Sequence, residues 1–421
     1  MLTKPRGTSD ILPGAVDVWH YLEGVLHKIC REYGYQEIRT PVFEATELFL
    51  RGVGDTTDIV DKEMYTFMDR GNRSLTLRPE GTAPTVRAYL ENKLHAGPQP
   101  VKVYYIGPMF RYDRPQAGRY RQFHQFGIEV FGANEPSVDA EVIMLAMEFY
   151  KQIGLKDLEL HINSVGCPVC RVQLHERLHD YFRPKLAELC GDCRERYEKN
   201  PLRLLDCKVC ADKHAADAPT TADSLCDSCR EHFAQVTGYL DLLQLPYVIN
   251  NRLVRGLDYY TNTAFEIIAS NIGAQSSIGG GGRYNGLVEV CGGPSTPGIG
   301  IALGLERIIL TMEQQGCAPP KPERLGVYVI NAGQEAEAAA IQLLFKIRNA
   351  GMSADKDYLG RSLKAQMKYA GKVNAQFTVI IGQDELADGT AVIRHMDAQE
   401  QVTVPQERVI HYLEEQLLMP Y

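Results

Sequence analysis

Four closely spaced arginines are the residues best suited to chemistry. Arg111, Arg114, Arg119 and Arg121 lie within eleven residues. Guanidinium groups keep their charge and grip phosphate oxygens with two donors at once. We therefore interpret this stretch as a phosphate-binding loop. For any single arginine the alternative is an ordinary surface ion pair, which contributes little.

The stretch after the arginines predicts a strand with two unlike faces. By alternation, Phe123, Gln125, Gly127, Glu129 and Phe131 share one face, and the mostly apolar residues between them share the other. The first face suits a small polar ligand, because glycine leaves room and the amide and carboxylate can orient the ligand. A solvated face of an antiparallel sheet gives the same alternation, so the pattern alone leaves both interpretations open.

The glycine-rich stretches do not match the common nucleotide-binding loops. No Gly-x-x-x-x-Gly-Lys-Ser/Thr occurs, and the runs at residues 279–282 and 298–304 do not fit Gly-x-Gly-x-x-Gly. Phosphate must then be held by arginines. We expect a nucleotide-using fold outside the P-loop and Rossmann classes.

Eight of the eleven cysteines form four Cys-x-x-Cys pairs. The pairs are Cys167 with Cys170, Cys190 with Cys193, Cys207 with Cys210, and Cys226 with Cys229. Each pair can supply two thiolates from one turn, so the eight thiols could bind two tetrahedral zinc ions, or four of them could bind one. In a reducing compartment metal ligation is expected before disulfides. The alternative is a relic zinc knuckle with free thiols.

The elements that position these residues follow from periodicity. Apolar residues at helical spacing predict a helix over residues 18–29, and residues 36–41 predict a short strand closed by proline. Residues 101–106 and 123–131 predict two strands that flank the arginine loop as a hairpin. A helix is expected over residues 303–312, after the second glycine cluster.

The chain is too long for one hydrophobic core, at 421 residues. Strands and helices alternate from about residue 325, which indicates a separate α/β domain, and the proline-rich residues 314–322 suit a linker. We expect a catalytic domain over residues 1–324, a Cys-rich subdomain inserted in it at residues 167–230, and a C-terminal α/β domain over residues 325–421.

Charge and hydropathy bear on the partners and the cellular compartment of the protein. The net charge of −8 argues against general affinity for nucleic acid, but a local arginine cluster can override it. The N-terminus lacks the apolar stretch of a secretory signal, and Glu306 and Arg307 interrupt the apolar run near residues 299–310. We therefore expect a cytoplasmic protein.

In their order along the chain, these segments resemble the class II aminoacyl-tRNA synthetases in the histidyl form. Residues 105–125 are similar to motif 2, the helix and strand ending at Pro41 to motif 1, and residues 297–307 to motif 3. Residues 75–82 (Leu-Thr-Leu-Arg-Pro-Glu-Gly-Thr) and 253–260 (Leu-Val-Arg-Gly-Leu-Asp-Tyr-Tyr) resemble stretches characteristic of histidyl-tRNA synthetases. The resemblance implies an α+β catalytic domain on an antiparallel sheet flanked by helices, a C-terminal anticodon-binding domain, and a homodimer formed through motif 1.

The resemblance also implies a two-step reaction. Histidine is activated with ATP and Mg²⁺ to histidyl-adenylate and pyrophosphate, and is then transferred to the 3′ end of tRNA(His). The attacking carboxylate is already charged, so positioning and charge stabilisation must supply the rate. A pocket that hydrogen-bonds polar atoms strongly rejects analogues lacking them, so no editing domain is expected.

Roles for individual residues follow from the same resemblance. Arg111, Arg255 and Arg307 are implied as catalytic. The implied histidine-binding residues are Glu80, Gly81, Thr82, Arg111, Gln125, Glu129, Arg255, Tyr259 and Tyr260. Those implied for ATP are Arg111, Arg119, Phe123 and Arg307, and those for the tRNA acceptor end are Arg114 and Gln116. Many members of the family lack the paired cysteines, so zinc is not intrinsic to the reaction.

Three other interpretations compete. A regulatory paralogue of ATP phosphoribosyltransferase keeps the fold without the chemistry, but such paralogues tend to lose the segment found here at residues 255–260 and the terminal domain. A zinc-based nucleic-acid-binding module leaves the arginines unexplained. A synthetase for another amino acid would need a pocket without Glu129 and Tyr260.

Overall fold

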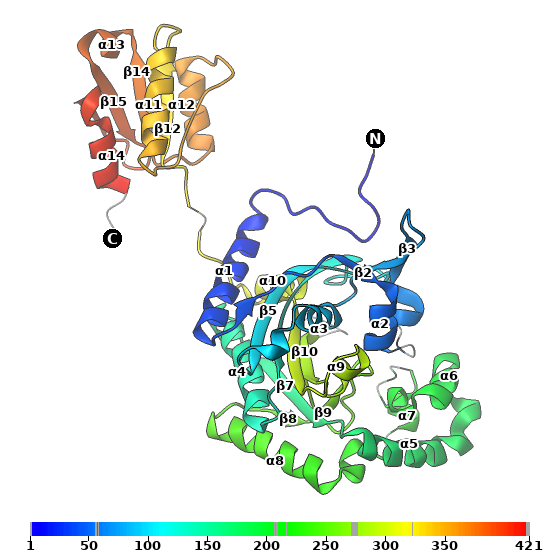
Figure 1. Cartoon of the computed structure of the whole chain (residues 1–421). Coiled ribbons are helices and arrows are strands. Elements are labelled where there is room, and N and C mark those ends of the chain that lie inside the picture. Colours follow the sequence, from blue (N-terminus) through cyan, green and yellow to red (C-terminus); the bar gives the residue numbers. More distant parts are fainter. Residues whose placement is uncertain are drawn as a thin grey trace. The chain divides into compact units, whose positions relative to one another are not determined.

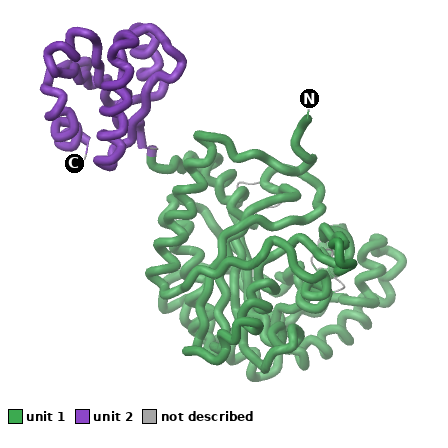
Figure 2. Tube along the Cα trace, turned by 45° about the horizontal axis from the view of Figure 1, so that its top comes forward, with its two compact units in different colours: residues 1–320 green, residues 321–421 purple. Residues whose placement is uncertain are grey.

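In a computed structural model the chain forms two compact units, residues 1–320 and 321–421 (Figure 2). The structure describes residues 2–54, 57, 59–205, 207, 209–215, 217–270, 277–321 and 323–417. The division falls inside the proline-rich stretch at residues 314–322. Within the described ranges, every helix is too short or too polar to cross a lipid bilayer.

The first unit is built on an eight-stranded sheet (Figure 1). In order across the sheet, the strands are β1 Gln36–Glu37, β5 Val101–Phe110, β6 Gln122–Phe131, β11 Gly298–Gly304, β10 Ser277–Arg283, β9 Thr261–Ala269, β7 Leu158–Ser164 and β8 Val248–Ile249. The six inner strands pair antiparallel, and each edge strand runs parallel to its neighbour. The expected α+β architecture and hairpin are confirmed. The strand expected over residues 36–41 is only two residues long.

Long helices bury one face of this sheet in the main core. They are α1 Val16–Glu32, α4 Pro136–Gln152, α8 Asp227–Leu242 and α10 Leu305–Gln315. The apolar face of β6, formed by Phe126, Ile128 and Val130, is fully buried in this core. Burying each such side chain contributes about 1.5–3 kcal/mol to stability. This face of β6 is therefore held against the core, and the alternating polar residues lie on the opposite face.

Short elements close over the polar face. They are β2 Phe43–Ala45, α2 Thr46–Val53, a π-helical turn Ile59–Glu63, β3 Tyr65–Met68, β4 Ser74–Leu77, α3 Thr82–Glu91, a 3-10 turn Leu94–Ala96 and α9 Leu287–Val290. The strands β2, β4 and β3 form a separate antiparallel sheet. From α3, Val86 and Tyr89 pack in a second core with Phe131 of β6 and with Tyr284, which directly follows β10. The sequence pattern predicted none of these short elements.

The Cys-rich insertion has a core of its own. It contains α5 Pro168–Phe182, α6 Gly191–Lys199, α7 Ala211–His214 and the 3-10 turns Arg183–Glu188, Pro201–Leu204 and Thr221–Ser224. Leu174, Leu178 and Phe182 of α5 are buried in this core. The helix α8 starts inside the insertion and carries Val236 and Leu240 into the main core (Figure 1). The insertion is therefore joined to the sheet by a continuous helix.

The second unit is a five-stranded sheet with helices on both faces. Its sheet order is β13 Ala354–Lys356, β12 Val327–Ala332, β14 Phe377–Gly382, β15 Thr390–His395 and β16 Gln401–Pro405. Its helices are α11 Glu337–Asn349, α12 Leu363–Lys372, α13 Gln383–Asp388 and α14 Val409–Leu417, with a 3-10 turn Gln406–Arg408. The alternation of strands and helices expected from about residue 325 is therefore present.

Candidate active site

Glu129 lies at the centre of the polar face of the large sheet. Its side chain is almost fully buried, with 1% of its surface exposed. Its carboxylate accepts hydrogen bonds from Thr82 Oγ1 at 2.7 Å, Tyr284 OH at 2.7 Å and Tyr105 OH at 3.3 Å. Burial raises the pKa of Glu129 to about 8, although the hydroxyls of Tyr284 and Thr82 oppose the shift. The polar face of β6 is therefore buried at Glu129, which excludes the interpretation as a solvated sheet face. The predicted alternation of polar and apolar faces along β6 is confirmed.

Glycines shape the space around this carboxylate. A Cβ added at Gly81 or Gly127 would overlap the ring of Tyr105, and one added at Gly300 would overlap Glu129. In the sheet register, Tyr105 lies opposite Gly127 and Gly300 lies opposite Glu129. Each glycine thus makes room for a large polar side chain of the next strand.

Glu80 and Thr82 lie where the chain enters α3. Glu80 accepts hydrogen bonds from the backbone N–H groups of Thr82 at 2.6 Å and Ala83 at 2.8 Å, so it caps the first turn of the helix. Burial raises the pKa of Glu80, and these N–H groups oppose the shift. Since Thr82 also donates to Glu129, the helix start and the sheet share one polar network.

A group of tyrosines lines the same network. The rings of Tyr259 and Tyr260 lie 4.8 Å apart, and Tyr259 meets Tyr284 edge-on at 5.9 Å. Burial raises the pKa of all three hydroxyls, so they stay neutral donors at physiological pH. Tyr105 and Tyr284 were missed in the sequence. The signals were their positions, one opposite a glycine across the hairpin and one directly after the glycine run of β10.

Arg255 lies between the tyrosines and β10. Its Nη1 donates to Glu266 Oε1 at 3.0 Å, and its guanidinium carbon lies 6.0 Å from the centre of the Tyr260 ring. A Cβ added at Gly280 would come within 2.6 Å of this guanidinium group. The carboxylate and the bare glycine therefore fix where the Arg255 charge lies.

Arg111 lies at the end of the hairpin, beside Phe123. Its Nε donates to the carbonyl oxygen of Pro79 at 2.8 Å, and its guanidinium carbon lies 5.3 Å from the centre of the Phe123 ring. Burial lowers the pKa of Arg111, and the carboxylates of Glu63 and Glu80 oppose the shift. Arg111 is thus the cation nearest the Glu80 end of the network.

Arg119 and Arg307 form the outer part of this cationic cluster. Arg119 pairs with Asp113 at 2.5 Å. Arg307 donates to the carbonyl oxygens of Ser277 at 2.6 Å and Gly118 at 3.3 Å. Burial lowers the pKa of Arg307, and the charges of Arg119 and Arg111 add to this shift. Three arginines, two from the hairpin and one from α10, thus lie close enough to repel one another, which favours binding of an anion.

The remaining predicted residues lie at the margin of the network. Arg114 and Gln116 are exposed in the loop between β5 and β6, where Gln116 forms an isolated bridge with Arg119. Gln125 lies in β6, near the end of the strand that joins the loop, and its buried Oε1 has no hydrogen-bond partner among the described residues. The structure therefore brings the other predicted substrate residues together and leaves Arg114 and Gln116 on the surface.

The eight paired cysteines form two groups of four. The first thiol group is Cys167, Cys170, Cys226 and Cys229, and the second thiol group is Cys190, Cys193, Cys207 and Cys210. Within each group the Sγ atoms all lie within 4.8 Å of one another. A tetrahedral zinc ion with Zn–S bonds of about 2.3 Å needs sulfur atoms about 3.8 Å apart, so both groups fit one ion.

Helix starts favour the thiolate form in these groups. Cys167, Cys190 and Cys226 each directly precede a helix. Burial opposes the shift, but hydrogen bonds from the first N–H groups of α5 lower the pKa of Cys167 to about 7. For Cys190 the N–H of Cys193 lowers the pKa. Because metals bind thiolates, these caps prepare both groups for a metal ion.

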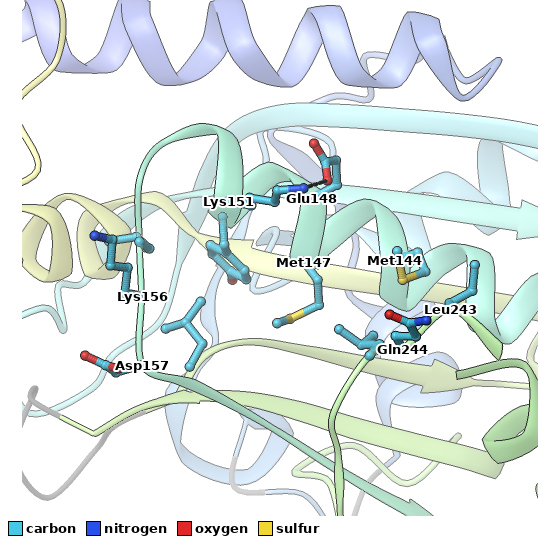
Figure 3. Close-up of a pocket in the computed structure, with 12 residues that line it drawn as sticks. Met144, Met147, Glu148, Lys151, Lys156, Asp157, Leu243 and Gln244 are labelled. Carbon is cyan, nitrogen blue, oxygen red and sulfur yellow. Dashed lines mark ion pairs between the residues drawn. The ribbon is translucent and has the colours of Figure 1, made fainter. Parts of the chain in front are cut away.

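A separate hollow lies away from this network (Figure 3). It measures about 380 Å³ and lies between α4 and the end of α8, where its lining includes Met144, Met147, Leu243 and Gln244. Glu148 and Lys151 at its edge are 3.6 Å apart. None of the predicted site residues lines it.

Comparison with known proteins identifies relatives over the whole chain. Residues 7–308 match the family model described as histidyl-tRNA synthetase, and residues 326–416 match an anticodon binding domain. A histidine–tRNA ligase of Pelotomaculum thermopropionicum is 66% identical over 99% of this chain and 98% of its own length. One of Desulforamulus reducens is 63% identical over 98% of this chain and 99% of its own length. A crystal structure of apo histidyl-tRNA synthetase from S. aureus matches with a TM-score of 0.85 and 43% identity, covering 98% of this chain and all of that one.

Proposed function

Since the chain belongs to the histidyl-tRNA synthetase family, we propose that the network around Glu129 binds histidine and that the arginines beside it bind ATP. The chain is a histidine–tRNA ligase, a class II aminoacyl-tRNA synthetase. The observation that carries the assignment of residues is the buried Glu129 carboxylate, ringed by hydroxyl groups on the same sheet face as Arg111 and Arg255.

Histidine needs acceptors at both ends of its pocket. Glu80 and Thr82 receive the α-ammonium group, with Gly81 leaving room beside them, and Gln125 lies near the carboxylate. Glu129 and Tyr260 bind the two imidazole nitrogens, and Tyr259 lines the ring. The buried Oε1 of Gln125 accepts no hydrogen bond among the described residues, and this supports a ligand that offers a donor there, such as the α-ammonium group next to the carboxylate.

Activation of histidine needs cations that offset the negative charge of the ATP phosphates, and it needs no general base, because the attacking carboxylate is already ionised. The histidine carboxylate attacks the α-phosphorus of ATP, a P–O bond forms, and pyrophosphate leaves with the electron pair of the broken bond. Arg111 and Arg255 approach the α-phosphate, while Arg119 and Arg307 hold the terminal phosphates and Phe123 stacks on adenine. Magnesium would accompany ATP and would offset part of the negative charge of its phosphates. The proximity of Arg119 and Arg111 to Arg307, which adds to the lowering of its pKa by burial, supports this division.

The exposed loop residues serve the second step. Arg114 and Gln116 meet the acceptor end of tRNA(His), since guanidinium and amide groups suit base edges. The variants Arg114→Ala and Gln116→Ala keep the exchange of pyrophosphate into ATP and lose discrimination between acceptor-end variants of the tRNA in gel-shift titrations. Undiminished discrimination would contradict this role.

Each thiol group holds one structural zinc ion. The support is the spacing of the four sulfur atoms in each group and the helix N–H groups that favour thiolates. We expect two zinc ions per chain in protein purified without chelators, measured by elemental analysis. Fewer than one per chain would refute zinc binding.

The protein works as a homodimer in the cytoplasm, where its tRNA is. The segment that resembles motif 1 supports the dimer, because it ends in an edge strand beside exposed apolar residues. Val42, Phe43, Phe67 and Met68 are each exposed by 40% or more, which is costly for a monomer. Sedimentation velocity should give a dimer in the wild type and a shift toward monomer in Phe67→Lys.

Exchange of pyrophosphate into ATP, measured with each amino acid in turn and without tRNA, tests the pocket assignment. We expect histidine alone to drive the exchange. The absence of exchange with every amino acid, in folded protein with magnesium, would favour the regulatory paralogue of ATP phosphoribosyltransferase.

A further inference from the structure

Arg171 of the Cys-rich insertion holds the segment that carries Tyr259 and Tyr260. It follows Cys170 in the first turns of α5. Its Nη1 donates to the carbonyl oxygen of Asp258 at 3.1 Å, and its Nη2 donates to the carbonyl oxygen of Tyr260. The two bonds straddle Tyr259, so one guanidinium fork fixes the backbone on both sides of that residue.

The next residues of the same segment are tied to the first thiol group. The N–H of Asn262 donates to the carbonyl oxygen of Gly166 at 3.0 Å, and the N–H of Val165 donates to that of Asn262 at 2.7 Å. The Sγ of Cys229 lies 3.7 Å from Asn262 Oδ1. Asn262 has a φ of 49°, a left-handed conformation that asparagine tolerates but that needs support from its surroundings. The backbone beside the first thiol group is therefore hydrogen-bonded directly to this strained residue.

A second contact from the insertion reaches the same segment. Asn200, which follows α6, donates through Nδ2 to Asp258 Oδ1 at 2.8 Å. On the other side of Asp258, its N–H bonds the carbonyl oxygen of Val53 at 3.3 Å, and Gly54 packs against its carboxylate. The insertion thus grips residues 258–262 at three points, while the hydroxyls of Tyr259 and Tyr260 face the network around Glu129.

We propose that Arg171 is a positioning residue for histidine, held in place by the metal-bound first thiol group. With the ion bound, the start of α5 is fixed against Cys226 and Cys229, and Arg171 then sets the backbone of residues 258–260. This makes the insertion a brace for the amino-acid pocket, whereas Arg111, Arg119 and Arg307 of the ATP site come from the hairpin and from α10, outside residues 258–262. The inference rests on the proposed histidine-binding role of Tyr259 and Tyr260.

Arg171→Met tests the brace, because it keeps the length of the stem and removes both donors. Arg177→Met is the matched control: it lies on the same helix, and its Nη1 bonds the carbonyl oxygen of Asp223 inside the insertion at 2.7 Å. In pyrophosphate exchange we expect Arg171→Met to raise the KM for histidine at least about tenfold, the factor expected for one lost charged hydrogen bond. The KM for ATP should stay within about twofold, and Arg171→Lys, which keeps one donor group, should recover part of the loss.

The outcomes separate the two proposals. A wild type that shows no histidine-dependent exchange contradicts the proposed function itself. An active wild type with an unchanged histidine KM in Arg171→Met, or with equal losses for histidine and ATP, overturns the brace alone.

Hydrogen exchange of the wild type provides a second test that does not depend on any variant folding. Removal of the metal by a chelator should deprotect the amides of Asp258 and Asn262, which donate to the carbonyl oxygens of Val53 and Gly166, with the β6 amides unchanged as the internal reference. Full protection of these two amides in metal-free protein would overturn the link to the first thiol group.

Discussion

Replacing Glu129 by glutamine separates selection of histidine from binding of ATP. The two side chains have the same shape, so above pH 8, where Glu129 is ionised, the change removes the charge and keeps one acceptor oxygen; the exchange assay is therefore run above pH 8. Tyr284 OH lies 3.4 Å from the carbonyl oxygen of Ile299 as well as 2.7 Å from Glu129. It can therefore turn to that carbonyl and accept a hydrogen bond from the new amide, and the pocket keeps its geometry.

The size of the effect follows from the bond that is lost. A hydrogen bond to a charged group contributes about 1.5–3 kcal/mol, against about 1 kcal/mol for a neutral one. For a buried imidazole partner we expect a net loss of about 2 kcal/mol, or about thirtyfold in kcat/KM for histidine. ATP does not touch this carboxylate in the proposed arrangement, so its KM should change by less than about twofold.

The assay is pyrophosphate exchange at varied histidine with saturating ATP, and then the reverse. Glu141→Gln is the matched control, because Glu141 pairs with Lys102 at 2.7 Å and lies outside the network. Its kinetic constants should equal those of the wild type. Equal losses for both substrates in Glu129→Gln would refute the assignment of Glu129 to the imidazole.

Four further changes probe other parts of the structure. Gly280→Ala should displace Arg255 and lower kcat about a hundredfold in the exchange assay, whereas Gly24→Ala, which meets no atom within 4 Å, should have no effect. The pKa of Glu129 is raised from 4.5 to about 8 in the folded protein, so the free energy of unfolding of the wild type falls as pH rises between these values. Glu129→Gln lacks this titration, so its stability relative to the wild type should increase by a few kcal/mol between these pH values and stay constant above them, as measured by calorimetry. Arg283→Met removes the arginine partner of the fully buried Asp139 carboxylate and leaves it with His232 Nε2 at 3.3 Å, and denaturant unfolding should show a loss of about 3 kcal/mol. Cys207→Ser should leave one zinc ion per chain and an unchanged histidine KM, because the second thiol group does not contact residues 258–262; a raised KM would show that both groups brace the pocket.

The hairpin and its central carboxylate could be predicted because the pleat of a strand fixes which side chains share a face. Once Phe126, Ile128 and Val130 are assigned to the core, Glu129 must face the other way. The same logic did not reveal Tyr105, since its position opposite Gly127 depends on the register of the hairpin and therefore on the length of an irregular loop.

Other features depend on contacts that leave no mark in the sequence. Four Cys-x-x-Cys pairs can combine in three ways, and the structure joins the first pair with the fourth and the second with the third. Arg171 binds carbonyl oxygens almost ninety residues away, and every residue type carries a carbonyl oxygen. The small sheet of β2, β3 and β4 consists of strands too short to show any periodicity.

The central claim is that hydrogen bonds to the imidazole select the substrate, and a matched pair of amino acids tests it directly. Exchange of pyrophosphate into ATP should be compared for histidine and for thienylalanine, whose five-membered ring has a similar shape and no ring nitrogen. A pocket built to hydrogen-bond a ring rejects an analogue that leaves its own buried groups unpaired, so we predict a kcat/KM lower by about 10⁴-fold or more. Activation of thienylalanine within about tenfold of histidine would show that ring shape alone decides, and would contradict the role of Glu129 and Tyr260.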